Sequence, residues 1–120
     1  MTEGLINLSK ELEDVGLIWQ PRLGDEVVLR DDMSHVSVIN ANHDLNPHVL
    51  RSAYLWLPRI EQLIAQIEAR QGLICHAGIN SACAYEIVVK FPKGFIEVYE
   101  WTFRTAFALA VLRMLLYRDC

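Results

Sequence analysis

Positive charge is scarce in this chain. Its 120 residues contain 11 Lys and Arg against 15 Asp and Glu, which gives a formal net charge of −4 at pH 7. Proteins that bind the phosphate backbone need clustered Lys and Arg to displace counterions. The charge balance therefore argues against nucleic acid as a partner.

Long apolar runs and export signals are also missing. The opening residues, MTEGLINLSKELEDVG, carry acids from Glu3 onward instead of a basic start and an apolar run, so we expect neither a signal nor a transit peptide. The most apolar segment, FALAVLRMLLY, is interrupted by Arg113 and too short to span a membrane. We expect a cytoplasmic protein without a membrane partner.

Cysteine is too sparse to form a disulfide framework. Three cysteines are an odd number, and without an export signal they favour reduced thiols. The sequence has no repeat, low-complexity tract or Pro/Gly/Ser linker, and 120 residues are enough to bury a core without staples. These features predict one domain over residues 1–120, and we expect no cofactor.

Apolar spacing predicts the first elements. Leu5, Leu8, Leu12 and Val15 form the stripe of an amphipathic helix over residues 3–15, which Gly16 ends in a left-handed conformation. The segment GDEVVLRDDMSHVSVIN is typical of a hairpin, with its turn at residues 31–34. The segment VLRSAYLW fits a strand, a helical turn or extended chain equally well.

A second helix and hairpin follow. In LPRIEQLIAQIEARQG, Pro58 suits the first helical turn and Gly72 the end. LICHA and AYEIVVKF are typical of strands, and PKG turns the chain into a final helix at about residues 98–118. The order helix, hairpin, helix, hairpin, helix predicts an α+β domain with a mostly antiparallel sheet covered by helices.

The final helix predicts an interface. It is apolar nearly all round and must be covered on more than one side. We expect part of that surface to join a second copy of the chain in a homodimer. The candidate interface residues are Phe103, Phe107, Val111, Leu112 and Leu116.

The loop at residues 40–48, NANHDLNPH, holds the strongest candidate for chemistry. His43, Asp44 and His48 are residue types that hold a divalent metal or activate a water. Pro47 breaks the helical spacing that would align them, so the folded loop would have to bring them together. The alternative is that they are solvated residues that cap turns.

The stretch CHAGINSAC raises a second question. A three-residue loop at residues 78–80 would place Cys75 opposite Cys83 on the buried face, with Leu73 and Tyr85, and turn His76 outward. A two- or four-residue loop would instead set His76 opposite Cys83, the pair a thiol nucleophile would need. Hydrophobic burial favours the first register, with both thiols reduced in the core.

Other groups have structural explanations. Glu97 and Glu100 precede the predicted final helix and complement its dipole. Asp31 and Asp32 suit a solvated turn. The tryptophans, Trp19, Trp56 and Trp101, are candidates for a ligand pocket, although such residues more often anchor a core or an interface.

The chain resembles a known group of proteins in three segments: LWLPRIEQLIAQIEARQG, AYEIVV and EWTFRTAFALAVLRML. Over residues 55–117 the chain resembles small phage- and prophage-encoded proteins related to the phage ABA-sandwich domain. Phe103 and Phe107 are bulkier than the residues expected there. The family implies no activity and no site residues.

These observations predict a small, non-enzymatic, cytoplasmic domain that acts by protein association as a homo-oligomer. The alternative is a protein that binds a metal or a small ligand through His43, Asp44 and His48. The sequence supplies no catalytic residue for the first hypothesis.

Overall fold

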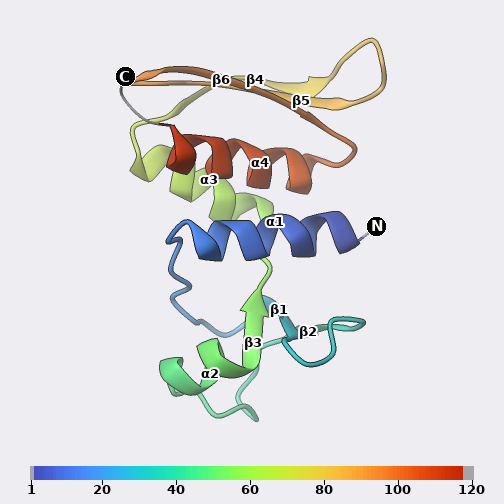
Figure 1. The fold of residues 1–120 in the computed structure, drawn as a ribbon, viewed down its shortest axis with the longest axis vertical. Helices are drawn as coiled ribbons and strands as arrows, with labels where there is room; N and C mark the ends of the chain where they lie inside the picture. The colour runs from blue at the N-terminus through green and yellow to red at the C-terminus, as the bar shows by residue number, and fades with distance from the viewer. Residues whose placement is uncertain (1, 118–120) are drawn as a thin grey trace.

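The chain folds into layers in which helices separate two antiparallel sheets (Figure 1). A computed structural model describes residues 2–117. Sheet A has the strand order β2-β1-β3 and sheet B the order β4-β5-β6, so the predicted α+β class is confirmed. The elements are, in chain order, α1 (Thr2–Asp14), β1 (Glu26–Leu29), β2 (Val36–Val38), α2 (Pro47–Ala53), β3 (Tyr54–Trp56), α3 (Ile60–Ala69), β4 (Leu73–Ile79), β5 (Tyr85–Phe91), β6 (Gly94–Glu100) and α4 (Phe103–Leu116).

The predicted element order is correct only in part, because the chain makes two sheets. Residues 49–56, which the sequence pattern left open, form most of α2 and then β3, and α2 begins at Pro47, inside the predicted loop. Asn46 Oδ1 accepts a hydrogen bond from the His48 N–H at 2.9 Å, which caps α2. β3 pairs with β1, and this third strand completes sheet A.

A second error lies at residues 98–100, the expected start of the final helix, which instead form the end of β6 (Gly94–Glu100). Ile96 and Val98 are buried while Phe95, Glu97 and Tyr99 are exposed, which is the alternation of a half-buried strand. The helix begins later, where Thr102 Oγ1 accepts a hydrogen bond from the Thr105 N–H at 3.1 Å. The end of the predicted helix, residue 118, lies outside the described residues.

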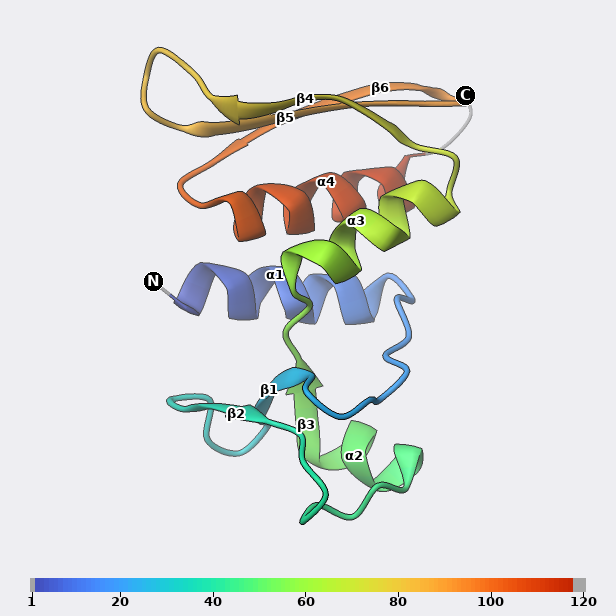
Figure 2. The ribbon, with the colours of Figure 1, turned by 180° about the vertical axis from the view of Figure 1, so that it is seen from behind.

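α4 lies between sheet B and the other two long helices. It contacts β5 and β6 on one side and α1 and α3 on others, an order that Figures 1 and 2 show from opposite directions. Its inner side chains complete the main core; the buried ones are Thr105, Ala106, Phe107, Ala108, Ala110, Val111, Leu112 and Met114. Within residues 2–117, no helix is both long and apolar enough to cross a membrane.

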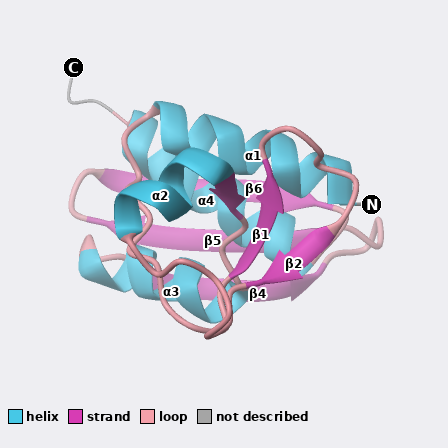
Figure 3. Cartoon of the chain, turned by 90° about the horizontal axis from the view of Figure 1, so that it is seen from below, coloured by secondary structure: helices cyan, strands magenta, loops and turns pink. Residues whose placement is uncertain are grey.

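Sheet A and α2 form the far end of the molecule, nearest the viewer in Figure 3. Between them lies a small second core of Trp19, Val27, Ile39 and Leu50. Arg104 of α4 joins this end to the helices. It donates hydrogen bonds to Glu26 Oε1 at 2.8 Å and to the carbonyls of Leu57 and Pro58 at 2.6 and 2.8 Å.

Two glycines end helices for different reasons. Gly16 has φ 101°, which confirms the left-handed stop predicted after α1. After α3 it is Gln71 that turns left-handed, with φ 63°. Gly72 is needed for space, because a Cβ there would lie 2.5 Å from Ile67 Cγ2 and 2.8 Å from the Ile67 carbonyl oxygen.

Candidate functional site

His43, Asp44 and His48 take part in separate local contacts in the structure. His43 Nδ1 lies 3.1 Å from both the backbone nitrogen and Oδ1 of Asn40, so either tautomer of the ring has a hydrogen-bond partner within the same turn. Asp44 Oδ1 accepts one from the Asn46 N–H at 3.0 Å, and His48 lies exposed in the first turn of α2. Across the described part of the chain, no three His, Cys, Asp or Glu side chains gather closely enough to hold a metal ion.

The second hairpin has neither predicted register. Its turn lies at residues 80–84, where Asn80 Oδ1 accepts hydrogen bonds from the Ala82 and Ala84 N–H groups at 2.9 and 3.1 Å. Because this asparagine closes the loop, Ile79 pairs with Tyr85 instead of Cys75 with Cys83.

The prediction that both thiols are buried together is therefore wrong. Cys83 sits in the turn with φ 64°, and Cys75 lies where the register shifts in a β-bulge; both are free and exposed. The bulge also turns Leu73 outward. His76 points outward as predicted, with its Nε2 3.4 Å from Glu86 Oε1, so no base meets a thiol here.

Most of the interface predicted on α4 is covered by the chain itself. Phe107, Val111 and Leu112 are 5, 0 and 3 % exposed and pack in the main core. Phe103 is half-buried, and Leu116 is 47 % exposed. The apolar surface that suggested a second chain is thus covered by α1, α3 and sheet B. The oligomeric state itself stays a prediction.

The predicted acid pairs lie on strands and turns. Glu97 and Glu100 belong to β6, so their assignment to a helix dipole is wrong. Asp31 and Asp32 occupy the exposed turn after β1, as predicted. The Ser34 hydroxyl and N–H donate to Asp32 Oδ1, and these hydrogen bonds lower the pKa of that carboxyl.

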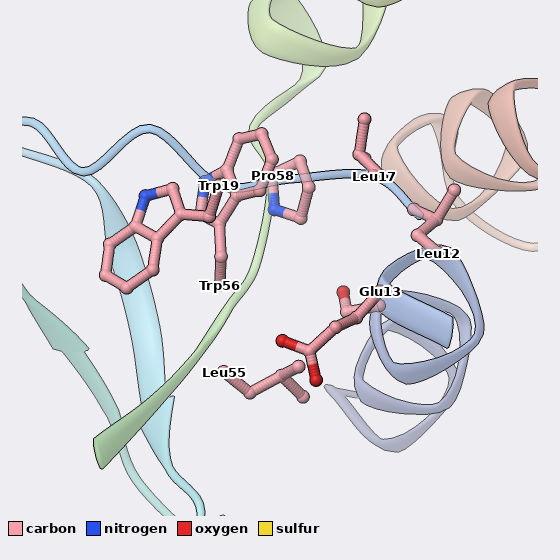
Figure 4. Close-up of a pocket in the computed structure, with 8 residues that line it drawn as sticks. Leu12, Glu13, Leu17, Trp19, Leu55, Trp56 and Pro58 are labelled. Carbon is pink, nitrogen blue, oxygen red and sulfur yellow. The ribbon is translucent and has the colours of Figure 1, made fainter. Parts of the chain in front are cut away.

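Trp19 and Trp56 line a cavity between α1 and β3 that is too small for a ligand (Figure 4). The volume of this cavity is about 10 Å³, which is close to the space that one water molecule needs. Trp101 lies elsewhere and is 74 % exposed. The three tryptophans do not share a pocket.

Asp25 is the main buried charge, and its contacts explain it as a structural group. It is 2 % exposed, and its Oδ2 accepts hydrogen bonds from Trp19 Nε1 at 2.8 Å and the Arg22 N–H at 2.9 Å. Gln62 Nε2 donates to Oδ1 at 2.7 Å, and Arg59 Nη1 lies 4.0 Å away. The carboxylate holds the loop before β1 against α3.

One surface stands out because none of the other described elements covers it: the outer face of sheet B, which points away from the helices in Figures 1 and 2. Strand pairing places its side chains in three rows across the sheet. The first row is Leu73, Lys90 and Phe95, in the order β4, β5, β6. The middle row is His76, Val88 and Glu97, and the third row is Gly78, Glu86 and Tyr99. We call these nine residues the outer face.

The outer face is rich in exposed apolar side chains. Leu73, Phe95 and Tyr99 are 63, 64 and 48 % exposed, and Trp101 continues the line of β6 at 74 %. A soluble surface scatters such residues singly, whereas a group on one sheet face marks an interaction site. Aromatic residues are also the types that dominate the energetics of protein interfaces.

Charged groups separate these apolar residues. The Tyr99 hydroxyl donates a hydrogen bond to Glu97, and this raises the pKa of Tyr99 to about 12. Lys90 Nζ lies 5.9 Å from the centre of the Phe95 ring. With Glu86 and Glu97 on the same surface, the outer face is unsuited to phosphate backbones.

The sequence analysis missed this surface, although a signal was present. Phe95, Glu97 and Tyr99 alternate with the buried Ile96 and Val98 at a period of two residues. Because the final helix was predicted to begin at about residue 98, β6 was not predicted, and neither were the three outer-face residues that it carries.

No family model, curated protein or solved structure matches the chain. The resemblance to phage ABA-sandwich proteins therefore remains a prediction.

Proposed function

We propose that this protein acts by protein association, as a homo-oligomer, through the outer face of sheet B. The observation that carries the proposal is the group of large apolar side chains, 48–64 % exposed, on a sheet face that no other element within residues 2–117 covers. Burial of apolar area is the main favourable term in association, and Leu73, Phe95 and Tyr99 offer it on one face of sheet B.

The arrangement of the polar groups supports association over catalysis. His43, Asp44 and His48 each take part in hydrogen bonds within local turns. Among the contacts of the described residues, neither Cys75 nor Cys83 has a neighbouring base. We place the protein in the cytoplasm, because free exposed thiols are typical of a reducing compartment. The proposed origin in a phage or prophage genome rests on the sequence resemblance alone.

Light scattering coupled to size-exclusion chromatography tests the proposal across a dilution series. We expect a dimer at high micromolar concentration that dissociates on dilution. Leu73→Ser should shift dissociation to higher concentration, because Leu73 lies on the outer face.

The matched control is Leu23→Ser. Leu23 is 60 % exposed, nearly the same as Leu73 at 63 %, but lies in the loop before β1. Its variant should associate like the unchanged protein. A monomer at every concentration, or equal effects of the two substitutions, would overturn the proposal.

A further inference from the structure

The central strand of the outer face carries opposite charges at its two ends. Glu86, Val88 and Lys90 of β5 point the same way because alternate residues of a strand share a face. Along β5, the outer face is therefore negative at Glu86, apolar at Val88 and positive at Lys90, while His76 and Glu97 flank Val88 on the neighbouring strands. Such a surface is complementary to a copy of itself turned end to end.

Two simple two-fold axes can bring two such faces together, and they differ in which charges meet. An axis that runs across the strands through Val88 reverses the strand direction. Lys90 then lies opposite Glu86 of the partner subunit, and Phe95 opposite Tyr99 of the partner subunit. Leu73, the only apolar side chain that β4 contributes to the nine outer-face residues, lies over Gly78 of the partner subunit, which has no side chain.

An axis that runs along the strands gives the opposite electrostatics. Each end row of the outer face would then meet itself. Lys90 would lie opposite the partner's Lys90, and Glu86 opposite the partner's Glu86. Like charges placed directly opposite each other in an interface suppress that arrangement. The charge pattern of β5 thus selects the first axis.

We propose that two copies of this chain pack sheet B face to face about a two-fold axis across the strands at Val88, with Lys90 of each copy paired to Glu86 of the partner subunit. The inference rests on the proposed function and adds the geometry of the contact. Sheets that pack face to face lie about 10 Å apart. Lys and Glu side chains reach across that gap.

The same axis brings one unfavourable pair together. Glu97 would lie opposite the partner's Glu97 on β6, an edge strand whose side chains reach water. Glu97→Gln removes this repulsion and should strengthen the dimer. A matching substitution on the favourable pair, Lys90→Gln, should weaken it.

Charge reversal provides the decisive experiment, with the dissociation constant measured by analytical ultracentrifugation. Lys90→Glu and Glu86→Lys alone should each weaken the dimer by about tenfold or more. The double variant Lys90→Glu with Glu86→Lys restores the opposite charges and should recover most of the affinity. Lys10→Glu, an equal charge change on an exposed position of α1, is the control and should have little effect.

The outcomes separate the geometry from the proposed function. If the unchanged protein dimerises and loses the dimer on Leu73→Ser, but the double variant is no tighter than the single ones, association stands and this axis is wrong. Strengthening by Lys90→Gln would indicate the axis along the strands. If the unchanged protein is monomeric, the proposed function itself fails. Circular dichroism of each variant confirms that it is folded.

Discussion

Gln62 of α3 donates a hydrogen bond of 2.7 Å from its Nε2 to Oδ1 of Asp25, and this joins the main helical layer to the loop that enters sheet A. The carboxylate also accepts from Trp19 Nε1 and the Arg22 N–H. Three donors therefore depend on a single side chain that is 2 % exposed. A buried donor without a partner costs more than the bond itself contributes.

Asp25→Ala should lower the free energy of unfolding by about 3 kcal/mol or more, since it leaves these three donors without an acceptor. Urea denaturation followed by circular dichroism measures the loss. Asp31→Ala, in the exposed turn after β1, is the control and should change the value by no more than about 0.5 kcal/mol. Similar losses in both variants would contradict the structural role of Asp25.

Gly72→Ala should destabilise the protein because the new Cβ would collide with Ile67. Overpacking of this kind costs about 1–3 kcal/mol. Gly4→Ala is the matched substitution in an open position, since no atom lies within 4 Å of a Cβ built there, and it should raise the stability of α1 by about 0.5–1 kcal/mol. Thermal unfolding of the two variants should therefore shift in opposite directions.

Phe107→Ala distinguishes a core from an interface on α4. Phe107 is 5 % exposed within a single chain, so its truncation should cost about 3–5 kcal/mol in the free energy of unfolding. Leu116, on the same helix, is 47 % exposed, and Leu116→Ala should cost less than about 1 kcal/mol. Chemical denaturation at a fixed protein concentration provides the comparison; equal losses would place both residues in the same environment.

Tyr99 should titrate unusually late. Its hydrogen bond to Glu97 raises the pKa from the model-compound value of 10.0 to about 12. Because the folded pKa lies above the unfolded one, the stabilisation is fully present below pH 10 and is lost as the pH rises toward 12. Absorbance at the tyrosinate band should show one late transition. Glu97→Gln should move that transition back toward pH 10, and an unchanged titration would exclude the contact.

Local patterns predicted the elements whose apolar spacing is regular. The stripe from Leu5 to Val15 gave α1, and the alternation from Tyr85 to Phe91 gave β5. Both are decided by nearest neighbours in the sequence and by one buried face. The left-handed stop at Gly16 belongs to the same group, because the conformational freedom of glycine is a local property.

The rest depends on tertiary contacts or on single polar side chains. β3 is three residues long and exists because β1 offers it an edge to pair with. The register of β4 and β5 follows from the Asn80 side chain and a bulge at Cys75, which no hydrophobic count reveals. The outer face could not be predicted without β6. That strand was missed because the apolar helix α4 follows it almost directly.

The central position of α4 also governs how the chain can fold while it is being made. α4 follows every other described element in the chain, yet its side chains fill the layer between α1 and sheet B. Until this helix has left the ribosome, the inner faces of α1, β5 and β6 have nothing to pack against. α1 is made first of these elements, so its apolar stripe must wait for α4 while the segment between them is synthesised, a period in which exposed apolar surface is prone to aggregation.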